Sequence, residues 1–206
     1  MSKREDNTVA TKERIVDAAE VLFDKYGITS TSLASIAQEA NVSTGTIFAY
    51  YPAKSDIIRA ILRRLFEKST LRDLPAEPAR SPDEAMEQLQ AIVQRAVDAG
   101  AKSVRAVSAA WSAIQLDPAF AGLWEREQSR RWNELKLFTS QWAEHGLLKP
   151  NLTATQAADI LWSMTGPLVF RAFVRESGWD TQQYDRWLKM VLYREVLGVG
   201  TPPEFR

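Results

Sequence analysis

Apolar residues recur at three- and four-residue spacing along most of this 206-residue chain, and no stretch alternates apolar and polar residues convincingly. Such spacing places apolar side chains on one face of an α-helix, whereas a half-buried strand needs alternation. Glycines, prolines and N-capping residues divide the pattern into about nine helices, four before residue 71 and five after residue 82. The sequence therefore predicts an all-α protein.

A proline-rich segment at residues 71–82, LRDLPAEPARSP, separates the two groups of helices. It has no apolar periodicity, so we predict a loop there. We expect three helices over residues 1–54 to form an N-terminal domain. A helix over residues 55–70 connects it to a second helical domain, which completes the region 55–206.

Two features predict how the later helices are divided. Ser81-Pro82-Asp83-Glu84 combines an N-cap serine, a proline at the first helical position and a capping-box glutamate. We expect the helix that starts there to end at Gly100, with a separate helix following. Pro167 lies inside a predicted helix over residues 153–177, and we expect it to kink that helix.

The composition limits the possible chemistry. The chain has no cysteine, and its single histidine, His145, stands beside Gly146 at a predicted helix end, where a capping role is the simpler interpretation. We find no paired-carboxylate motif, nucleophile–base spacing, glycine-rich phosphate loop or metal-ligand cluster. The sequence therefore predicts no catalytic residues, no metal site and no cofactor, and we expect a protein that is not an enzyme.

Charge and hydropathy bear on partners and location. Lys and Arg together number 26, as do Asp and Glu, so no global basic excess indicates nucleic acid. A neutral protein can still bind phosphates through helix N-termini and a few placed cations. No apolar run approaches the roughly 20 residues that cross a bilayer. The polar start is unlike a secretory signal, so we expect a cytoplasmic protein without a membrane partner.

Residues 31–54, TSLASIAQEANVSTGTIFAYYPAK, hold two short helical segments joined by a tight turn. Asn41 can take the left-handed conformation that ends the first helix, Val42 can pack between the two, and Ser43 can cap the second. This arrangement is typical of a helix-turn-helix, whose second helix enters the major groove of DNA. From the residues alone, a generic helical hairpin with ordinary caps remains the alternative.

The residues of the second helix are compatible with binding in the major groove of DNA. Thr44, Gly45 and Thr46 are short, so the amides at its start can approach a phosphate. Tyr50 is predicted to point outward, and Lys54 would add a cation close to the next helix.

This segment resembles the TetR family of bacterial transcriptional regulators. The resemblance is close over about residues 11–66, and helix number and length extend it more weakly along the rest. Asn41 stands where the family usually has glycine, and Phe48 where it usually has tyrosine. The matching positions are Thr31-Ser32, Ile36-Ala37, Ala40, Val42-Ser43, Gly45, Ile47, Tyr50-Tyr51 and Lys54.

The resemblance implies which residues contact DNA. Phosphate contacts are expected from Thr31, Ser32, Ser43, Thr44, Tyr50 and Lys54, and contacts to base edges from Gly45, Thr46 and Ala49. Because Phe48 lacks a hydroxyl, one phosphate hydrogen bond of the family is expected to be missing. So few long polar groups suggest modest direct readout, supplemented by DNA shape.

The resemblance also implies a pocket for a small effector among the later helices, where all seven tryptophans lie. For most of these tryptophans a core position is the simpler interpretation. Arg131 is either a polar anchor in the pocket or a side chain that reaches solvent. An apolar or aromatic effector is expected, with Trp111, Gln128, Arg131, Trp132, Leu135, Phe138, Trp162 and Met164 as candidate contacts.

The last two predicted helices, residues 153–177 and 181–197, bear apolar residues over much of their circumference. One helix needs one apolar stripe to pack within its own domain, so a second stripe indicates a partner. The resemblance implies that these helices pair in a homodimer. It also implies that residues 1–54 are a helix-turn-helix DNA-binding domain and residues 55–206 an effector-binding and dimerisation domain. We therefore expect a homodimeric repressor that an effector releases from operator DNA. The alternative is a small-molecule-binding or interaction protein whose helix-turn-helix is vestigial.

Overall fold

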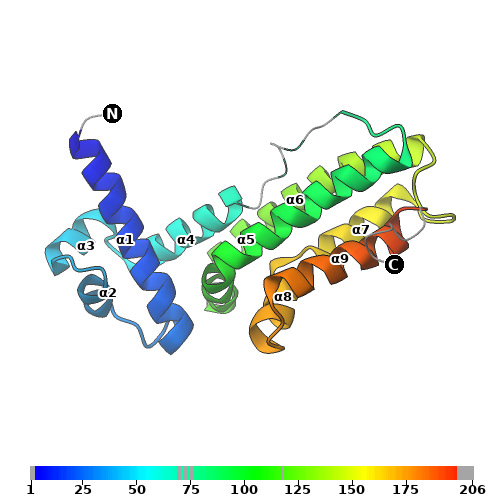
Figure 1. Cartoon of the computed structure of the whole chain (residues 1–206). Coiled ribbons are helices and arrows are strands. Elements are labelled where there is room, and N and C mark those ends of the chain that lie inside the picture. Colours follow the sequence, from blue (N-terminus) through cyan, green and yellow to red (C-terminus); the bar gives the residue numbers. More distant parts are fainter. Residues whose placement is uncertain (1–2, 69–70, 72–73, 75–76, 117, 199–206) are drawn as a thin grey trace. The chain divides into compact units, whose positions relative to one another are not determined.

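A computed structural model describes residues 3–68, 71, 74, 77–116 and 118–198 (Figure 1). Within these ranges the chain is helical, apart from loops and a single isolated bridge between Leu148 and Leu197. The all-α prediction is confirmed. The elements are α1 (Lys3–Tyr26), α2 (Leu33–Glu39), α3 (Thr44–Tyr50), α4 (Lys54–Lys68), α5 (Pro82–Leu116), α6 (Pro118–Glu144), α7 (Ala154–Met164), α8 (Pro167–Phe170), the π-helical turn η1 (Arg171–Glu176) and α9 (Thr181–Val196).

Gly100 does not end a helix, contrary to the prediction, because α5 continues through it to Leu116. A Cβ atom added at Gly100 would lie 2.5 Å from Cγ of Phe170. The absence of a side chain therefore makes room for the Phe170 ring. This packing offsets the roughly 1 kcal/mol by which glycine disfavours a helix interior relative to alanine.

Pro167 divides the predicted helix over residues 153–177 instead of kinking it. The α7 segment ends at Met164, Gly166 takes an extended conformation, and Pro167 begins the short helix α8. Proline has no N–H to donate within a helix, but its fixed φ suits a first helical position. The following turn, η1, has π-helical hydrogen bonding. The single predicted helix is thus three elements.

Contacts divide the chain into two compact units. Unit 1 comprises residues 1–67 and 103–124, and unit 2 comprises residues 68–102 and 125–206. Helix α4 belongs to unit 1 by this measure, whereas we predicted a functional boundary after residue 54. That functional boundary stays a prediction.

In unit 1, α1 packs against α2, and α2 packs against α3. The apolar positions that predicted these helices point inward. Their fully buried members include Ile15, Ala19, Ile36, Ile47, Ile57 and Ile61. Burying one such side chain contributes about 1.5–3 kcal/mol, so these residues hold the short helices α2 and α3, which would not be stable alone.

Arg64 of α4 joins three acidic residues of α1. Its Nη1 donates to Glu13 Oε2 at 3.0 Å and to Asp17 Oδ1 at 2.7 Å, and its Nη2 donates to Glu20 Oε1 at 2.5 Å. Burial lowers the pKa of Arg64, but the hydrogen bonds to Glu20 and Asp17 outweigh it and hold that pKa above its usual value. This cluster fixes α4 against α1, and α4 leads directly from α3.

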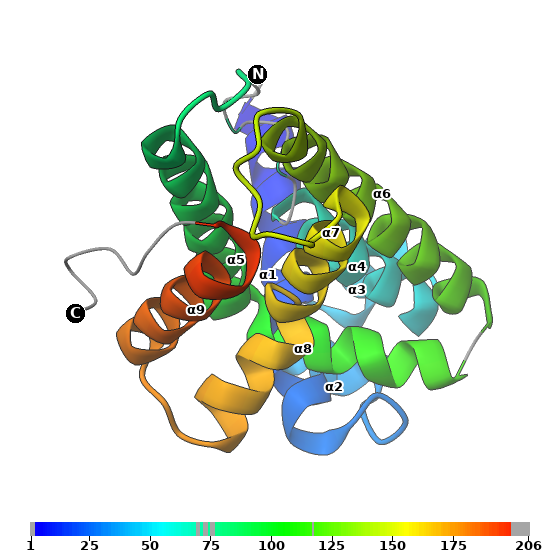
Figure 2. The same ribbon diagram turned by 90° about the vertical axis from the view of Figure 1, so that its right-hand side faces the viewer.

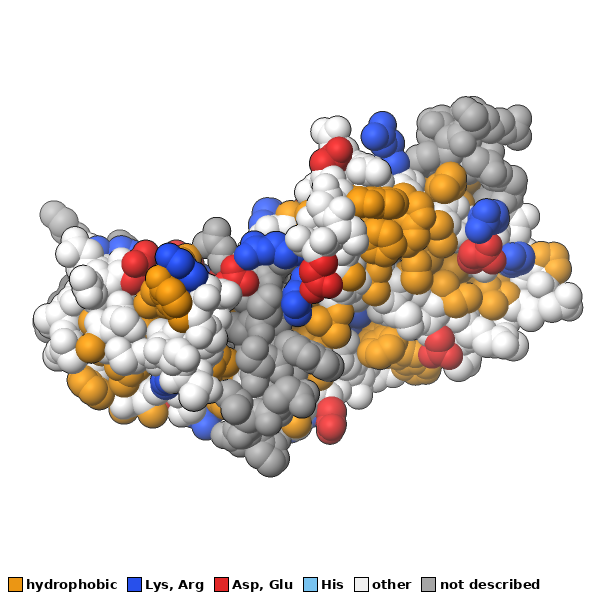
Figure 3. Space-filling model, turned by 90° about the horizontal axis from the view of Figure 1, so that it is seen from below, with side chains coloured by type: hydrophobic (Ala, Val, Ile, Leu, Met, Phe, Trp, Pro, Cys, Tyr) orange, Lys and Arg blue, Asp and Glu red, His pale blue; other side chains and the backbone are white. Residues whose placement is uncertain are grey.

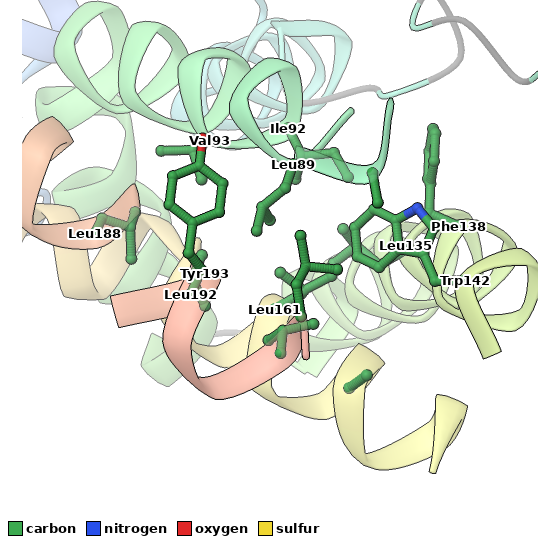
Figure 4. Packing of buried hydrophobic residues seen from close by; sticks show 14 of the residues in the cluster. Leu89, Ile92, Val93, Leu135, Phe138, Trp142, Leu161, Leu188, Leu192 and Tyr193 are labelled. Carbon is green, nitrogen blue, oxygen red and sulfur yellow. The ribbon is translucent and has the colours of Figure 1, made fainter. Parts of the chain in front are cut away.

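In unit 2, one hydrophobic cluster is built from the start of α5, from α6, α7 and α9, and from the segments between them (Figure 4). Helices α7 and α9 lie side by side (Figure 2). Leu89, Leu135, Trp142, Leu161, Leu188 and Leu192 are fully buried in the cluster. The indole Nε1 of Trp142 donates to Gln88 Oε1 at 2.7 Å, so its polar atom is satisfied.

Candidate DNA-binding site

The turn between α2 and α3 has the geometry that the sequence predicts. Asn41 is in the left-handed region, with φ of 52°. Its backbone N–H donates to Gln38 O at 3.1 Å, and the N–H of Val42 donates to Ala37 O at 3.0 Å. These bonds satisfy carbonyl groups at the end of α2. The chain therefore passes from α2 to α3 over the four residues 40–43.

Serine residues cap both helices of the motif. Ser32 Oγ accepts from the backbone N–H of Ser35 at 3.0 Å at the start of α2. Ser43 Oγ accepts from the N–H of Thr46 at 3.0 Å at the start of α3, and it also hydrogen-bonds Thr46 Oγ1 at 2.8 Å. Each cap contributes about 1 kcal/mol. Both serines stay exposed, so each combines a cap with a surface position.

Helix α3 separates a buried side from an exposed side. Ile47 is fully buried, and Tyr51, just after the helix, is 8% exposed. Thr44, Gly45 and Ala49 are exposed, and Thr46 is half-buried. The exposed side thus presents short side chains and the backbone around them. A surface of this kind can approach another molecule closely.

Phe48 lies on this exposed side with 51% of its surface accessible. From the sequence, Phe48 was expected to matter only through the hydroxyl that it lacks. An exposed aromatic ring beside the short exposed residues of α3 is a contact candidate, because it can pack on apolar groups such as a thymine methyl. Its position one residue after the buried Ile47 is the signal that could have placed it outside.

Tyr50 is half-buried and lies near a cation from α1. The ammonium of Lys12 is 5.6 Å from the centroid of the Tyr50 ring. An exposed cation–π contact of this kind contributes about 0.5–1 kcal/mol. Lys12 is therefore an exposed positive charge beside the motif. Sequence reasoning missed it, because nothing in the spacing of α1 relates this lysine to Tyr50.

Thr31 is a correction to the predicted set. It is only 3% exposed, and its hydroxyl donates to Gly27 O at 2.8 Å. A second carbonyl, that of Leu22, lies 3.3 Å from the same oxygen. The hydroxyl thus hydrogen-bonds carbonyl groups at the end of α1 and is not accessible to a phosphate. Ser32, the next residue, is the exposed member of this pair.

Lys54 is the first residue of α4, and its ammonium donates to Ile28 O at 2.7 Å. The prediction placed this cation at a phosphate. One of the three ammonium donors is thus engaged inside unit 1 and the side chain is half-buried. Lys54 therefore has a structural role, and its contact with a phosphate stays a prediction.

The candidate effector residues fall into two groups, both in unit 2. Gln128 and Trp132 of α6 line an open groove of about 400 Å³ with Trp162 of α7. The Nε1 of Trp132 donates to Asp159 Oδ1 at 2.8 Å on the same groove. Leu135 and Phe138 are buried in the core cluster instead, and Met164 is half-buried against it.

Two candidates need separate mention. The side chain of Trp111 lies outside the described residues. Arg131 is only 7% exposed, so the interpretation that it reaches solvent is wrong. Its Nη2 donates to Thr165 Oγ1. Burial lowers the pKa of Arg131 to about 10, which still leaves the side chain positively charged at neutral pH.

Comparison with known proteins decides the family. Residues 15–61 match the family model described as bacterial regulatory proteins, tetR family. The HTH-type transcriptional regulator BetI of Paraburkholderia phymatum is 30% identical over 178 residues, which cover 83% of this chain and 85% of the relative. The chain belongs to the TetR family. It is therefore a TetR-family transcriptional regulator, as the motif over residues 31–54 predicted.

Solved structures have the same fold as this TetR-family chain. A transcriptional regulator from Saccharomonospora viridis in complex with choline has a TM-score of 0.69 and 19% identity, covering 90% of this chain and 97% of that one. SmeT in complex with triclosan has a TM-score of 0.65 and 18% identity, covering 96% and 97%. At such identities the likeness concerns the fold alone.

The described part of this TetR-family chain has neither a membrane-spanning helix nor a cluster of metal ligands. None of its helices is both long and apolar enough to cross a membrane. No group of three or more acidic or histidine side chains is placed to hold a metal ion there.

Proposed function

We propose that this TetR-family regulator binds operator DNA through α2 and α3, acts as a repressor, and is released by a small effector bound in unit 2. The observation that carries the proposal is α3 itself. It is capped by Ser43, anchored by the fully buried Ile47, and exposed along a side of short residues. Such a helix can enter a major groove with its N-terminal residues at the base edges.

Individual contacts are assigned within this proposal. Ser32, Ser43, Thr44 and Tyr50 are exposed or half-buried and are proposed to contact phosphates, with Lys54 contributing a donor that Ile28 does not use. Gly45 and Ala49 are proposed to lie against base edges. Thr46 would offer its methyl group, since its hydroxyl is hydrogen-bonded to Ser43. Phe48 and Lys12 are added to the predicted set.

The proposed active form is a homodimer through residues 153–177 and 181–197. Figure 3 shows a broad surface of hydrophobic side chains, coloured orange, over the part of the molecule that contains α7 to α9. Two recognition helices must lie about 34–36 Å apart to enter successive major grooves, which a two-fold dimer achieves. Met190 of these elements is exposed, and their partly buried apolar residues include Ile160, Val169, Phe173, Val174 and Trp187.

The proposed effector is a small molecule with a largely apolar or aromatic body. Two structural neighbours are in complex with small molecules, one with triclosan and the other with choline. Gln128, Trp132 and Trp162 line an open groove, whereas Arg131 adds a buried positive charge to the same unit. That charge opposes a cationic effector close to it.

A matched pair of variants tests the DNA-binding surface. Ala49→Glu places a carboxylate on the exposed side of α3, where repulsion by phosphates is expected to weaken binding about tenfold or more. Ala143→Glu makes the same change at an exposed position of α6 in unit 2 and is expected to leave binding unchanged. Fluorescence anisotropy with DNA from the protein's own promoter region measures both.

The outcomes separate the proposal from a vestigial motif. Equal binding by wild type, Ala49→Glu and Ala143→Glu would exclude α3 from the DNA contact. No specific binding by the wild type at low salt would favour a small-molecule-binding or interaction protein whose helix-turn-helix has lost its function.

A further inference from the structure

Arg131 is a buried cation with few partners. It lies on α6 with 7% of its surface exposed, and its Nη2 donates to Thr165 Oγ1. A guanidinium has five N–H donors. Among the residues that the structure describes, Thr165 is the one hydrogen-bond partner of Arg131, and it is neutral. Most of the hydrogen-bonding capacity of this group is therefore unused within unit 2.

The carboxylates on either side of Arg131 along α6 pair with another arginine. Glu127 and Glu134 flank Arg131 on α6, but both form ion pairs with Arg130. Glu134 Oε2 also accepts from the backbone N–H of Leu71 at 3.0 Å. These carboxylates act on Arg131 through space without contacting it. The buried charge thus lacks a counter-ion at bonding distance, although burial without one is costly.

The end of α7 compensates the charge only in part. Thr165 is the C-cap of α7, and its hydroxyl donates to Leu161 O at 2.6 Å. Tyr184 of α9 donates to Met164 O at 3.3 Å at the same helix end. These carbonyl groups form the negative pole of the helix, which favours a nearby cation. The pole is a partial charge, however, and its carbonyls already have donors.

We propose that unit 2 binds a small organic carboxylate with an apolar body, and that Arg131 is its counter-ion. The unused N–H groups of a guanidinium match the two oxygens of a carboxylate in a forked pair. One cation beside the negative pole of α7 suits a single negative charge better than a phosphate, which carries nearly two. The proposal rests on the effector part of the proposed function and specifies its chemical class.

The expected apolar body follows from the hydrophobic cluster of unit 2, to which Leu135 on α6, Leu161 on α7 and Leu188 on α9 belong. The hydroxyl of Thr165, which accepts from Arg131, donates to Leu161 O of this cluster. A carboxylate that enters this apolar environment loses its hydrating water, which costs free energy, so the attraction of one cation is not sufficient to bind it. An alkyl or aryl group attached to the carboxylate contributes the compensating burial.

The test compares acids with alcohols of the same skeleton. Straight-chain carboxylates from acetate to decanoate, and benzoate, are added to the full-length protein, each beside its matched alcohol, and the melting temperature is measured. We expect at least one acid to raise the melting temperature of the wild type by several degrees and its alcohol to have little effect. Binding to the native state alone produces such a shift.

Three variants connect the effect to the residue. Arg131→Gln is expected to weaken binding of that acid about tenfold or more, since a charged hydrogen bond is lost. Arg131→Lys keeps the charge without the fork and is expected to retain part of the preference for acid over alcohol. Arg126→Gln removes an exposed arginine from the same helix and is expected to respond as the wild type does.

Several results would overturn the proposal. It fails if no acid raises the melting temperature of the wild type, if acid and alcohol act equally, or if Arg131→Gln responds as strongly as the wild type. If Arg131→Gln does not fold, Arg131→Lys decides by its acid-to-alcohol ratio, and an unchanged ratio and affinity would count against the proposal. Operator binding, measured separately without any acid, reports on the proposed DNA-binding function independently.

Discussion

The ammonium of Lys54 lies 2.7 Å from the carbonyl oxygen of Ile28, to which it donates a hydrogen bond. Ile28 comes two residues after the end of α1, and Lys54 is the first residue of α4. The lysine thus connects these two helices across the motif that lies between them. A cation close to the C-terminus of α1 also interacts favourably with the dipole of that helix.

Substituting Lys54 by alanine is expected to have two separable effects. The free energy of unfolding should fall by about 1.5–3 kcal/mol, the contribution of a hydrogen bond to a charged group. If Lys54 also contacts a phosphate, the slope of log affinity against log salt should fall by about one unit. Urea unfolding measures the first effect, and anisotropy titrations at several salt concentrations measure the second.

Thr31→Val is the control for this prediction. It removes a hydroxyl from a carbonyl at the same end of α1 without changing any charge. We expect it to lower stability by about 1–2 kcal/mol and to leave the salt slope unchanged. A destabilised Lys54→Ala protein with the wild-type slope would assign Lys54 to the fold alone.

Removing Arg64 is expected to destabilise unit 1 strongly. Arg64→Met takes the cation away from Glu20, which is only 8% exposed, and leaves that carboxylate without its ion pair. Breaking a largely buried pair from one side costs about 2–4 kcal/mol after allowance for partial exposure. Chemical denaturation followed by circular dichroism provides the value.

Two further variants show whether the ion pair is responsible. Arg63→Met changes an exposed arginine of the same helix, and its effect should stay within about 0.5 kcal/mol. Arg64→Met combined with Glu20→Met should recover part of the loss, because no buried carboxylate is then left unpaired and the other two partners, Glu13 and Asp17, are exposed. A double variant less stable than Arg64→Met alone would contradict this explanation.

Gly100→Ala is expected to destabilise unit 2, although alanine is the better helix former. The new Cβ would meet the Phe170 ring at 2.5 Å, and displacing the ring costs about 1–3 kcal/mol. Gly45→Ala is the matched control, since its Cβ would lie 3.7 Å from Ser43 Oγ in ordinary contact. Thermal unfolding of both proteins compares them, and an equal gain in stability for both would refute the packing argument.

Local sequence signals predicted most of unit 1. The caps at Ser32 and Ser43 and the left-handed Asn41 depend on neighbouring residues, so a short stretch of sequence specifies them. Gly100 and Pro167 were misjudged for a different reason. Whether a glycine ends a helix or admits a ring depends on a residue far along the chain, here Phe170.

Among the predicted site residues, too, some features depend on neighbouring residues and others on distant parts of the chain. Exposure of Thr44, Gly45 and Ala49 follows from the helical spacing around Ile47. The burial of Thr31 does not, because its hydroxyl is directed to the carbonyl of Gly27 by the path of the chain after α1. Arg131 was predicted as a candidate, but its lack of a charged partner depends on Arg130 attracting Glu127 and Glu134.

The seven residues of α3 include no ionisable side chain except Tyr50. An uncharged recognition surface gains little from the phosphate backbone, so under the proposed function attraction to DNA in general would come from other elements. The specificity for one operator and the overall affinity for DNA would then depend on different residues and could be changed separately. Replacing α3 by the corresponding helix of another regulator could therefore change the operator that this protein binds. The salt dependence of its DNA affinity would stay the same.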